Sequence, residues 1–95
     1  MLIVDAKVYF KKQEEGGLHR NGVSGMEPSF SVSGQLIMCK LISKEGVSDF
    51  VLGQEYLLSI ELPYGEIFEQ EVQPGYCFHL NIGGKEFATG VVIKG

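Results

Sequence analysis

The sequence predicts an all-β domain, either a small antiparallel barrel or a sandwich. Three observations lead to this prediction. Several short segments alternate apolar and polar residues with a period of two, which is typical of half-buried strands. Glycine is frequent, with 13 residues in 95, and it lies between these segments, where turns are needed. No segment sustains the apolar spacing of an amphipathic helix, so we expect no helix of any length.

The first strand is expected over residues 2–12. Its alternate positions are apolar (Val4, Ala6, Val8 and Phe10), and the positions between them are largely polar (Asp5, Lys7, Tyr9 and Lys11). Such alternation is expected where one face of a strand meets the core and the other meets water. Residues 16–28 follow as a long connection, whose four glycines and one proline argue against regular structure. Long connections are often functional, but this one could equally be a plain surface loop.

The middle of the chain predicts further strands at 29–33, 35–43 and 55–62. Residues 29–33 and 55–62 alternate cleanly, whereas residues 35–43 are apolar on both faces. The latter pattern predicts one strand that is covered on both sides or that has a partner surface outside, and periodicity does not settle which face is inward. Residues 68–72 are acidic and are the candidate for a short edge strand, charged against unwanted pairing.

The last quarter of the chain, residues 75–93, predicts a hairpin. One set of positions is apolar (Phe78, Leu80 and Ile82) and alternates with a second set (Cys77, His79 and Asn81). Gly83 and Gly84 can adopt the positive φ angles of a tight turn. The β-branched run at 91–93 then favours a strand, and Gly90 is expected to mark a bend in it.

Length and charge limit the possible functions. Ninety-five residues form one domain, spanning 1–95. The formal net charge of −4 argues against general nucleic-acid affinity, which needs a basic face, although a local basic patch stays possible. No run approaches the ~20 apolar residues of a membrane span, and the N-terminus lacks the basic region of a signal peptide. We expect a soluble cytoplasmic protein that does not bind membranes.

No catalytic, metal or nucleotide motif is recognised. Cys39 and Cys77 do not describe a disulfide framework. Cys77 and His79 share a strand face, but a zinc site needs more ligands than the sequence offers, and a nucleophilic pair needs a third orienting group. No phosphate-binding G-x-x-x-x-G-K-[ST] motif occurs. We therefore expect no enzyme activity, no cofactor, no metal and no bound nucleotide.

Two motifs resemble the C-terminal β-barrel domain of translation elongation factor Tu. The first lies in residues 6–30, where A-K-V-Y-F, E-E-G-G-L-H and G-M-E-P-S-F follow the family's A-x-V-Y-x-L, E-G-G-R-H and G-Y-R-P-Q-F. The second is F-H-L-N-I-G-G-K-E-F-A-T-G-V-V at 78–92, which resembles F-x-I-R-E-G-G-R-T-V-G-A-G-V-V. The resemblance covers nearly the whole chain. It implies a six-stranded antiparallel Greek-key barrel, here without the family's GTPase domain.

The resemblance also implies where partners would bind. In the family this barrel contacts the T stem of aminoacyl-tRNA, packs on the GTPase domain and binds the exchange factor, and the RNA contacts lie near the G-G-R-H loop and the E-G-G-R turn. These elements correspond here to two short segments (His19, Arg20 and Asn21; Gly83, Gly84 and Lys85). Leu18 stands where the family has Arg, Ile82 where it has an acidic residue, and Glu27 where it has a cation. The scaffold residues are retained and the ligand residues have changed.

These observations lead to three functional hypotheses. The first is a non-enzymatic, translation-related accessory module that binds another protein through an outer sheet face and the 16–28 loop. Leu57 marks such a face, unless the loops at 44–54 and 63–75 cover it. The cationic loop beside Lys85 would hold a phosphate or carboxylate, or is simply solvated. The second hypothesis is a tRNA-stem binder that uses His19, Arg20 and Lys85, and the third is a small enzyme.

Overall fold

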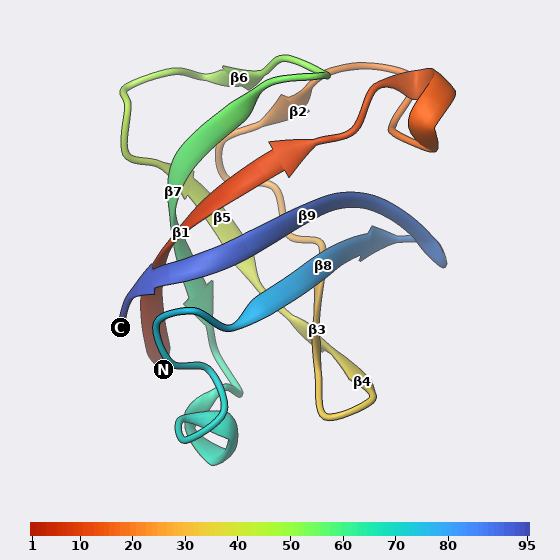
Figure 1. Cartoon of the computed structure of the whole chain (residues 1–95). Coiled ribbons are helices and arrows are strands. Elements are labelled where there is room, and N and C mark those ends of the chain that lie inside the picture. Colours follow the sequence, from red (N-terminus) through yellow and green to blue (C-terminus); the bar gives the residue numbers. More distant parts are fainter.

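The computed structural model describes all 95 residues and is an all-β fold, as the period-two alternation predicts (Figure 1). It has nine strands and two single-turn 3₁₀ helices: β1 (Leu2–Phe10), η1 (Gln13–Glu15), β2 (Gly22–Val23), β3 (Ser29–Val32), β4 (Gln35–Met38), β5 (Lys40–Ser43), β6 (Asp49–Phe50), β7 (Glu55–Leu62), η2 (Glu66–Phe68), β8 (Cys77–Ile82) and β9 (Lys85–Lys94). No helix in the structure is long or apolar enough to cross a membrane.

Seven strands form one antiparallel sheet that curls on itself as a half-barrel (Figure 1). Its strand order is β4-β3-β8-β9-β1-β7-β5. The two remaining strands, β2 and β6, pair only with each other through Gly22↔Phe50 and Val23↔Asp49. The long connection at 16–28, expected to lack regular structure, therefore contains one short strand. The expectation was wrong there. Gly22 lies so close to the rings of Phe10 and Phe50 that a Cβ atom would be crowded, and it is the lack of a side chain that lets the chain pair with β6 at this point.

The segment 35–43, expected to be a single strand, is divided at Cys39 into β4 and β5. These two strands are consecutive in the chain but lie at opposite edges of the sheet. Backbone hydrogen bonds hold the junction against residues 25–28: the Cys39 N–H donates to the Pro28 carbonyl at 3.1 Å, and the Leu41 N–H donates to the Met26 carbonyl at 3.0 Å. The apolar pattern on both faces reflects this change of edge and not a strand covered on two sides.

The core fills the inside of the curled sheet. Its 18 buried residues include the predicted inner face of β1, with Val4, Ala6, Val8 and Phe10 at most 1% exposed. Two stacked aromatic pairs span the core, with ring centroids 4.8 Å apart for Phe10 and Phe50 and 4.4 Å apart for Phe30 and Phe78. Such pairs add to the stabilisation from burial alone. The burial of these four β1 residues confirms the alternation predicted for this strand.

Two short helices correct other expectations. The first strand ends at Phe10 and not at residue 12, because the chain enters the turn of η1 after Lys12. Residues 68–72 do not form an edge strand. The Val72 N–H donates to the Phe68 carbonyl at 3.0 Å, a helical-type bond, and Val72 is buried while Phe68 packs against the core. Residues four apart share one face in a helical turn and in a strand alike, so the spacing of Phe68 and Val72 does not distinguish the two structures.

The closing hairpin forms as predicted, with one difference. Gly83 and Gly84 connect Ile82 to Lys85 with φ angles of 56° and 79°, as a two-residue hairpin turn requires. A register shift between Leu80 and Asn81 interrupts the ladder before the turn. Ile82, expected on the inner face, is 42% exposed, because this bulge and the approaching turn end the regular alternation.

Gly90 has a steric role that its predicted role as a bend does not include. It lies between Phe78 on β8 and Val8 on β1 in the strand registers. A Cβ atom at this position would lie 2.5 Å from the Phe78 Cζ atom and 2.8 Å from the Lys7 carbonyl oxygen. Both separations are far below van der Waals contact, so the Phe78 ring occupies the space that a side chain would need.

We therefore predict that Gly90→Ala lowers the free energy of unfolding by about 1–3 kcal/mol, the usual cost of an overpacked core. Urea denaturation measures this change. Gly95→Ala is the matched control, since nothing lies within 4 Å of a Cβ atom there. Equal stability of Gly90→Ala and the wild type would show that the sheet opens freely at this point, against the packing described.

Candidate functional site

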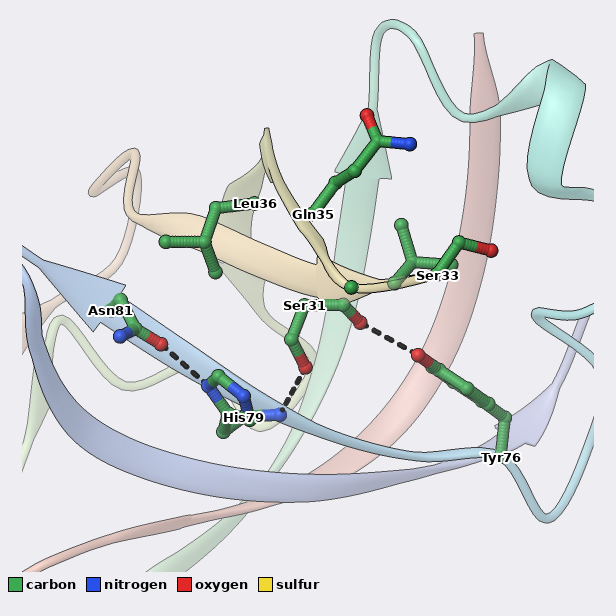
Figure 2. Close-up of a pocket in the computed structure, with 9 residues that line it drawn as sticks. Ser31, Ser33, Gln35, Leu36, Tyr76, His79 and Asn81 are labelled. Atoms are coloured by element: carbon green, nitrogen blue, oxygen red, sulfur yellow. Dashed lines mark hydrogen bonds between the residues drawn. The ribbon is translucent and has the colours of Figure 1, made fainter.

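A shallow depression lies on the outer face of the sheet, between the β3–β4 hairpin and β8 (Figure 2). Its volume is about 380 Å³. Its lining is mainly polar and comes from three segments of the chain (Ser31, Ser33, Gln35, Leu36, Tyr76, His79 and Asn81). A depression of this size and composition can accept side chains of a partner.

The depression exists because β3 and β8 diverge. These strands pair only at Ser29↔Asn81 and Phe30↔Leu80. Beyond Phe30, side chains replace the backbone ladder: the His79 N–H donates to Ser31 Oγ at 2.9 Å, and the Tyr76 hydroxyl donates to the Ser31 carbonyl at 2.7 Å (Figure 2). The longer side-chain bridges hold the two strands apart, which leaves the groove between them.

His79 lies at the centre of this surface, and its ring orientation is determined by Asn81. The His79 Nδ1 atom is 2.6 Å from the Asn81 Oδ1 atom. Because an amide oxygen only accepts, Nδ1 donates in this contact, which leaves Nε2 for a ligand. Figure 2 shows the ring beside the hairpin, with the Nδ1 bond directed along β8.

Glu86 adds an anionic group next to His79. Its Oε1 atom is 3.7 Å from His79 Nδ1, and its Oε2 atom accepts a hydrogen bond from Lys11 Nζ at 2.8 Å. The hydrogen bond from Lys11 is the main reason that the pKa of Glu86 lies below its ordinary value, and the charges of Lys11 and His79 act in the same direction. The Glu86 carboxylate is therefore ionised at neutral pH and is balanced by Lys11.

Apolar side chains border the groove on β4. Leu36 and Met38 are each 50% exposed, and the register places them opposite Ser31 and Ser29 on the same outer face of the hairpin. Between them, Ile37 is partly buried against the core. We call the outer surface made by Ser31, Leu36, Met38, His79 and Asn81 the hairpin face.

The predicted loop residues lie at another end of the molecule. The Nδ1 atom of His19 is 3.0 Å from Gln13 Nε2. Asn21 Oδ1 accepts a hydrogen bond from the Leu52 N–H at 3.2 Å, which ties the loop to the start of the β6–β7 turn. Arg20 is exposed, and its side chain takes part in no hydrogen bond or ion pair. The loop thus has one structural residue, Asn21, and one free cation.

The predicted turn residues stand on the β8–β9 hairpin. Gly83 and Gly84 form the turn itself, and the Lys85 side chain is exposed. No hydrogen bond or ion pair joins Lys85 to the loop at 19–21, and Figure 1 shows the loop and the turn as separate projections on the same side of the molecule. A shared role of these cations stays a prediction.

Leu57 is partly exposed, and residues 44–45 bind its backbone groups. The Leu57 N–H donates to Glu45 Oε1 at 2.6 Å, and the Leu57 carbonyl accepts from the Lys44 N–H at 3.0 Å. Its other neighbours in a depression of about 240 Å³ include Lys7 and Glu55. The Leu57 side chain thus lines a depression with charged neighbours, and its contact with a partner stays a prediction.

The two cysteines lie in different environments. Cys39 is fully buried, its Sγ atom donates to the Pro28 carbonyl at 3.4 Å, and burial raises its pKa to about 12. Cys77 is exposed on β8. Because Cys39 points into the core, it cannot join Cys77 and His79 around a ligand. No three His, Cys, Asp or Glu side chains converge as metal ligands anywhere in the chain.

Sequence reasoning missed the β4 part of the site. The signal that could have found it is Ser33-Gly34, which lies between two strands and forms a two-residue turn with φ angles of 50° and 71°. Reading this pair as a hairpin turn would have placed Leu36 and Met38 on the face opposite Phe30 and Val32. The contribution of Tyr76 had no comparable signal, since it depends on the position of a distant strand.

Thiol labelling tests the placement of the cysteines. We predict that a disulfide reagent such as DTNB modifies one thiol per folded chain at pH 8 and two after unfolding, because the thiolate is the reactive form and Cys39 is kept protonated and buried. Cys77→Ser should abolish labelling of the folded protein, and Cys39→Ser should leave it unchanged. Rapid labelling of Cys39 would contradict the description of the core at this strand junction.

No protein-family model matches this chain. The resemblance to the elongation factor Tu barrel therefore rests on the motifs within residues 6–30 and 78–92. Those motifs fall on β1 and its following loop and on the β8–β9 hairpin, so His79 and Asn81 of the hairpin face lie within the second motif, whereas Leu36 and Met38 on β4 lie outside both.

Proposed function

We propose that this protein is a non-enzymatic binding module that contacts another protein through the hairpin face. The observation that carries the proposal is the pair Leu36 and Met38, each half exposed and adjacent to a polar groove. Interfaces combine an apolar centre with hydrogen-bonding groups at its edge. Here the two β4 residues supply the apolar part, and His79 Nε2 and the Ser31 hydroxyl supply polar groups for a partner.

The groove is better suited to binding than to catalysis. A nucleophilic site needs a hydroxyl or thiol positioned by the imidazole that activates it. Ser31 Oγ instead accepts the backbone N–H of His79, while the ring Nδ1 is held by Asn81. The depression is open and shallow, and its polar groups are largely bonded to one another (Figure 2). These features support a contact surface.

We also infer that the sheet closes as a six-stranded antiparallel Greek-key barrel like that of the elongation factor Tu C-terminal domain. Counting β4 and β5 as one bent strand and leaving aside the two-residue strands β2 and β6 reduces nine strands to six. The hydrogen bonds from Cys39 and Leu41 to residues 26–28 extend β3 along β5, which supports closure of the ring. A barrel of this kind would act as an accessory to translation.

Charge favours a protein over RNA as the partner. The chain carries a formal net charge of −4, and the hairpin face contains no Lys or Arg side chain. RNA binding depends largely on cations that neutralise phosphates. The free cations Arg20 and Lys85 lie outside the hairpin face, on separate projections. A tRNA contact would therefore have to use a different surface.

A single substitution tests this proposal. Leu36→Lys should reduce capture of the protein's partner from a lysate of its source organism by at least about tenfold, because a charge would be buried in the interface. Quantitative mass spectrometry of the captured proteins provides the measurement. The substitution lies on an exposed side chain and should leave the free energy of unfolding nearly unchanged.

The matched control is Ile93→Lys, at an apolar residue that is 42% exposed on β9. It should bind as the wild type does. Undiminished capture by Leu36→Lys would contradict the proposal. So would binding of labelled tRNA at low salt that Arg20→Ala abolishes and Leu36→Lys does not affect.

A further inference from the structure

The backbone of β4 has hydrogen-bonding groups that no part of the molecule uses. In an antiparallel hairpin with a two-residue turn, bonded and non-bonded pairs alternate from the turn outward. Val32↔Gln35 and Phe30↔Ile37 are the bonded pairs, and the bond from the Cys39 N–H to the Pro28 carbonyl continues the alternation. The N–H and C=O groups of Leu36 and Met38 therefore point away from β3. No bond outside the β3–β4 ladder involves residues 35–38.

This open edge is short and has defined ends. At its C-terminal end the edge is limited by Lys40, which already pairs with Glu61 of β7. On the other side the chain reverses at Ser33 and Gly34, where Glu71 accepts hydrogen bonds from the Ser33 backbone and hydroxyl. Four residues remain between them, a length of about 13 Å at the rise of a strand.

Apart from its short length, the edge lacks the features that usually prevent strand addition. Natural edge strands are commonly protected by charged side chains, proline or a bulge. Residues 35–38 are Gln-Leu-Ile-Met, and their ladder with β3 has no register shift. An uncharged, regular and exposed edge is suited to pairing with another backbone.

We propose that β4 binds an extended segment of another protein as an added antiparallel strand. The proposal rests on the protein-binding function proposed above and specifies its partner. Residues of the segment opposite Leu36 and Met38 would form four backbone hydrogen bonds, and their side chains would lie beside these two residues on the hairpin face. The residue between them would face Ile37. The segment therefore has three consecutive apolar or β-branched residues, and main-chain bonds supply affinity while side chains supply specificity.

A second copy of this chain does not fit the same edge. Self-pairing about Ile37 is the register that opposes Leu36 of one copy with Met38 of the other. It would place Gly34 of the other copy opposite Lys40, where Glu61 of β7 already pairs. Two copies would also bring together chains with a formal net charge of −4 each. A single extended segment that is neutral or basic and leaves the edge before it reaches β7 avoids both the clash at Lys40 and the charge repulsion.

The probe is the peptide acetyl-Lys-Thr-Val-Val-Val-Thr-Lys-amide, titrated into ¹⁵N-labelled full-length protein. Its three valines match the open edge, and its lysines complement the acidic chain. We expect the largest chemical-shift changes at the amides of Leu36 and Met38, and hydrogen exchange at both amides at least about tenfold slower when the peptide is bound, because each N–H gains an acceptor.

N-methylated peptides separate strand addition from simple apolar contact. Methylation of the first and third valines removes the N–H groups that would face β4, and should weaken binding at least about tenfold relative to methylation of the middle valine alone. Leu36→Pro, which removes the outward N–H together with the leucine side chain, should weaken binding at least as much. If that variant does not fold, the peptide comparison on the wild type decides.

Absence of peptide binding, or equal affinity of the two methylated peptides, would overturn the proposal. So would a peptide-independent dimer in sedimentation experiments in which the Leu36 and Met38 amides are protected. The failure of the broader function looks different. In that case Leu36→Lys would leave partner capture unchanged, whereas failure of strand addition alone would leave capture sensitive to Leu36→Lys while the two methylated peptides bind equally.

Discussion

The passage of the chain through Cys39 is the constraint on which the rest of the structure depends. β4 and β5 are separated by this one residue, yet they occupy opposite edges of the seven-stranded sheet. A flat sheet cannot satisfy that connection, so the sheet curls as a half-barrel that brings its two edge strands toward each other at Cys39. Cys39 is fully buried at the junction, and its N–H and Sγ both donate to the Pro28 carbonyl. A small apolar residue with no unsatisfied polar group is suited to this position.

The same constraint determines which part of the sheet remains open. Beyond Cys39 the chain is covered on one side by β7 and on the other by residues 25–28, so β5 offers no free edge. Before Cys39 the hairpin of β3 and β4 projects from the body, and its outer edge has no neighbour (Figure 1). The divergence of β3 from β8, bridged by Ser31 and Tyr76, adds a groove beside that edge. The proposed binding surface is thus a consequence of how the sheet curls.

Much of the fold could be predicted from local patterns. The inner face of β1 and the Gly83-Gly84 turn follow from period-two alternation and from the need for positive φ angles, which involve only neighbouring residues. The division of segment 35–43 could not be predicted in this way, because its residues are apolar on both faces and periodicity does not show where a strand changes partners. The helical turn at 66–68 was hidden for another reason. The acidic composition of residues 68–72 resembles that of an edge strand. In the structure the chain forms a helical turn there and Val72 is buried.

The candidate site was less predictable than the fold, because its parts come from segments far apart in the sequence. Tyr76 and Ser31 are 45 residues apart, and their bond depends on the packing of β8 against β3. Leu57 illustrates the opposite difficulty. Its outward position could be predicted, but the bond from its N–H to Glu45 could not, since the loop geometry is absent from the pattern of the strand.

The outer edge of β4 is open, while the junction beside it at Cys39 is closed. Native-state hydrogen exchange of the free protein measures this difference. We expect the Leu36 and Met38 amides to exchange at nearly the rate of an unstructured chain, because they lack acceptors. The amides of Ile37, Cys39 and Leu41 donate within the sheet and should exchange far more slowly. Slow exchange at all five amides would contradict this expectation, because the edge would then already be covered.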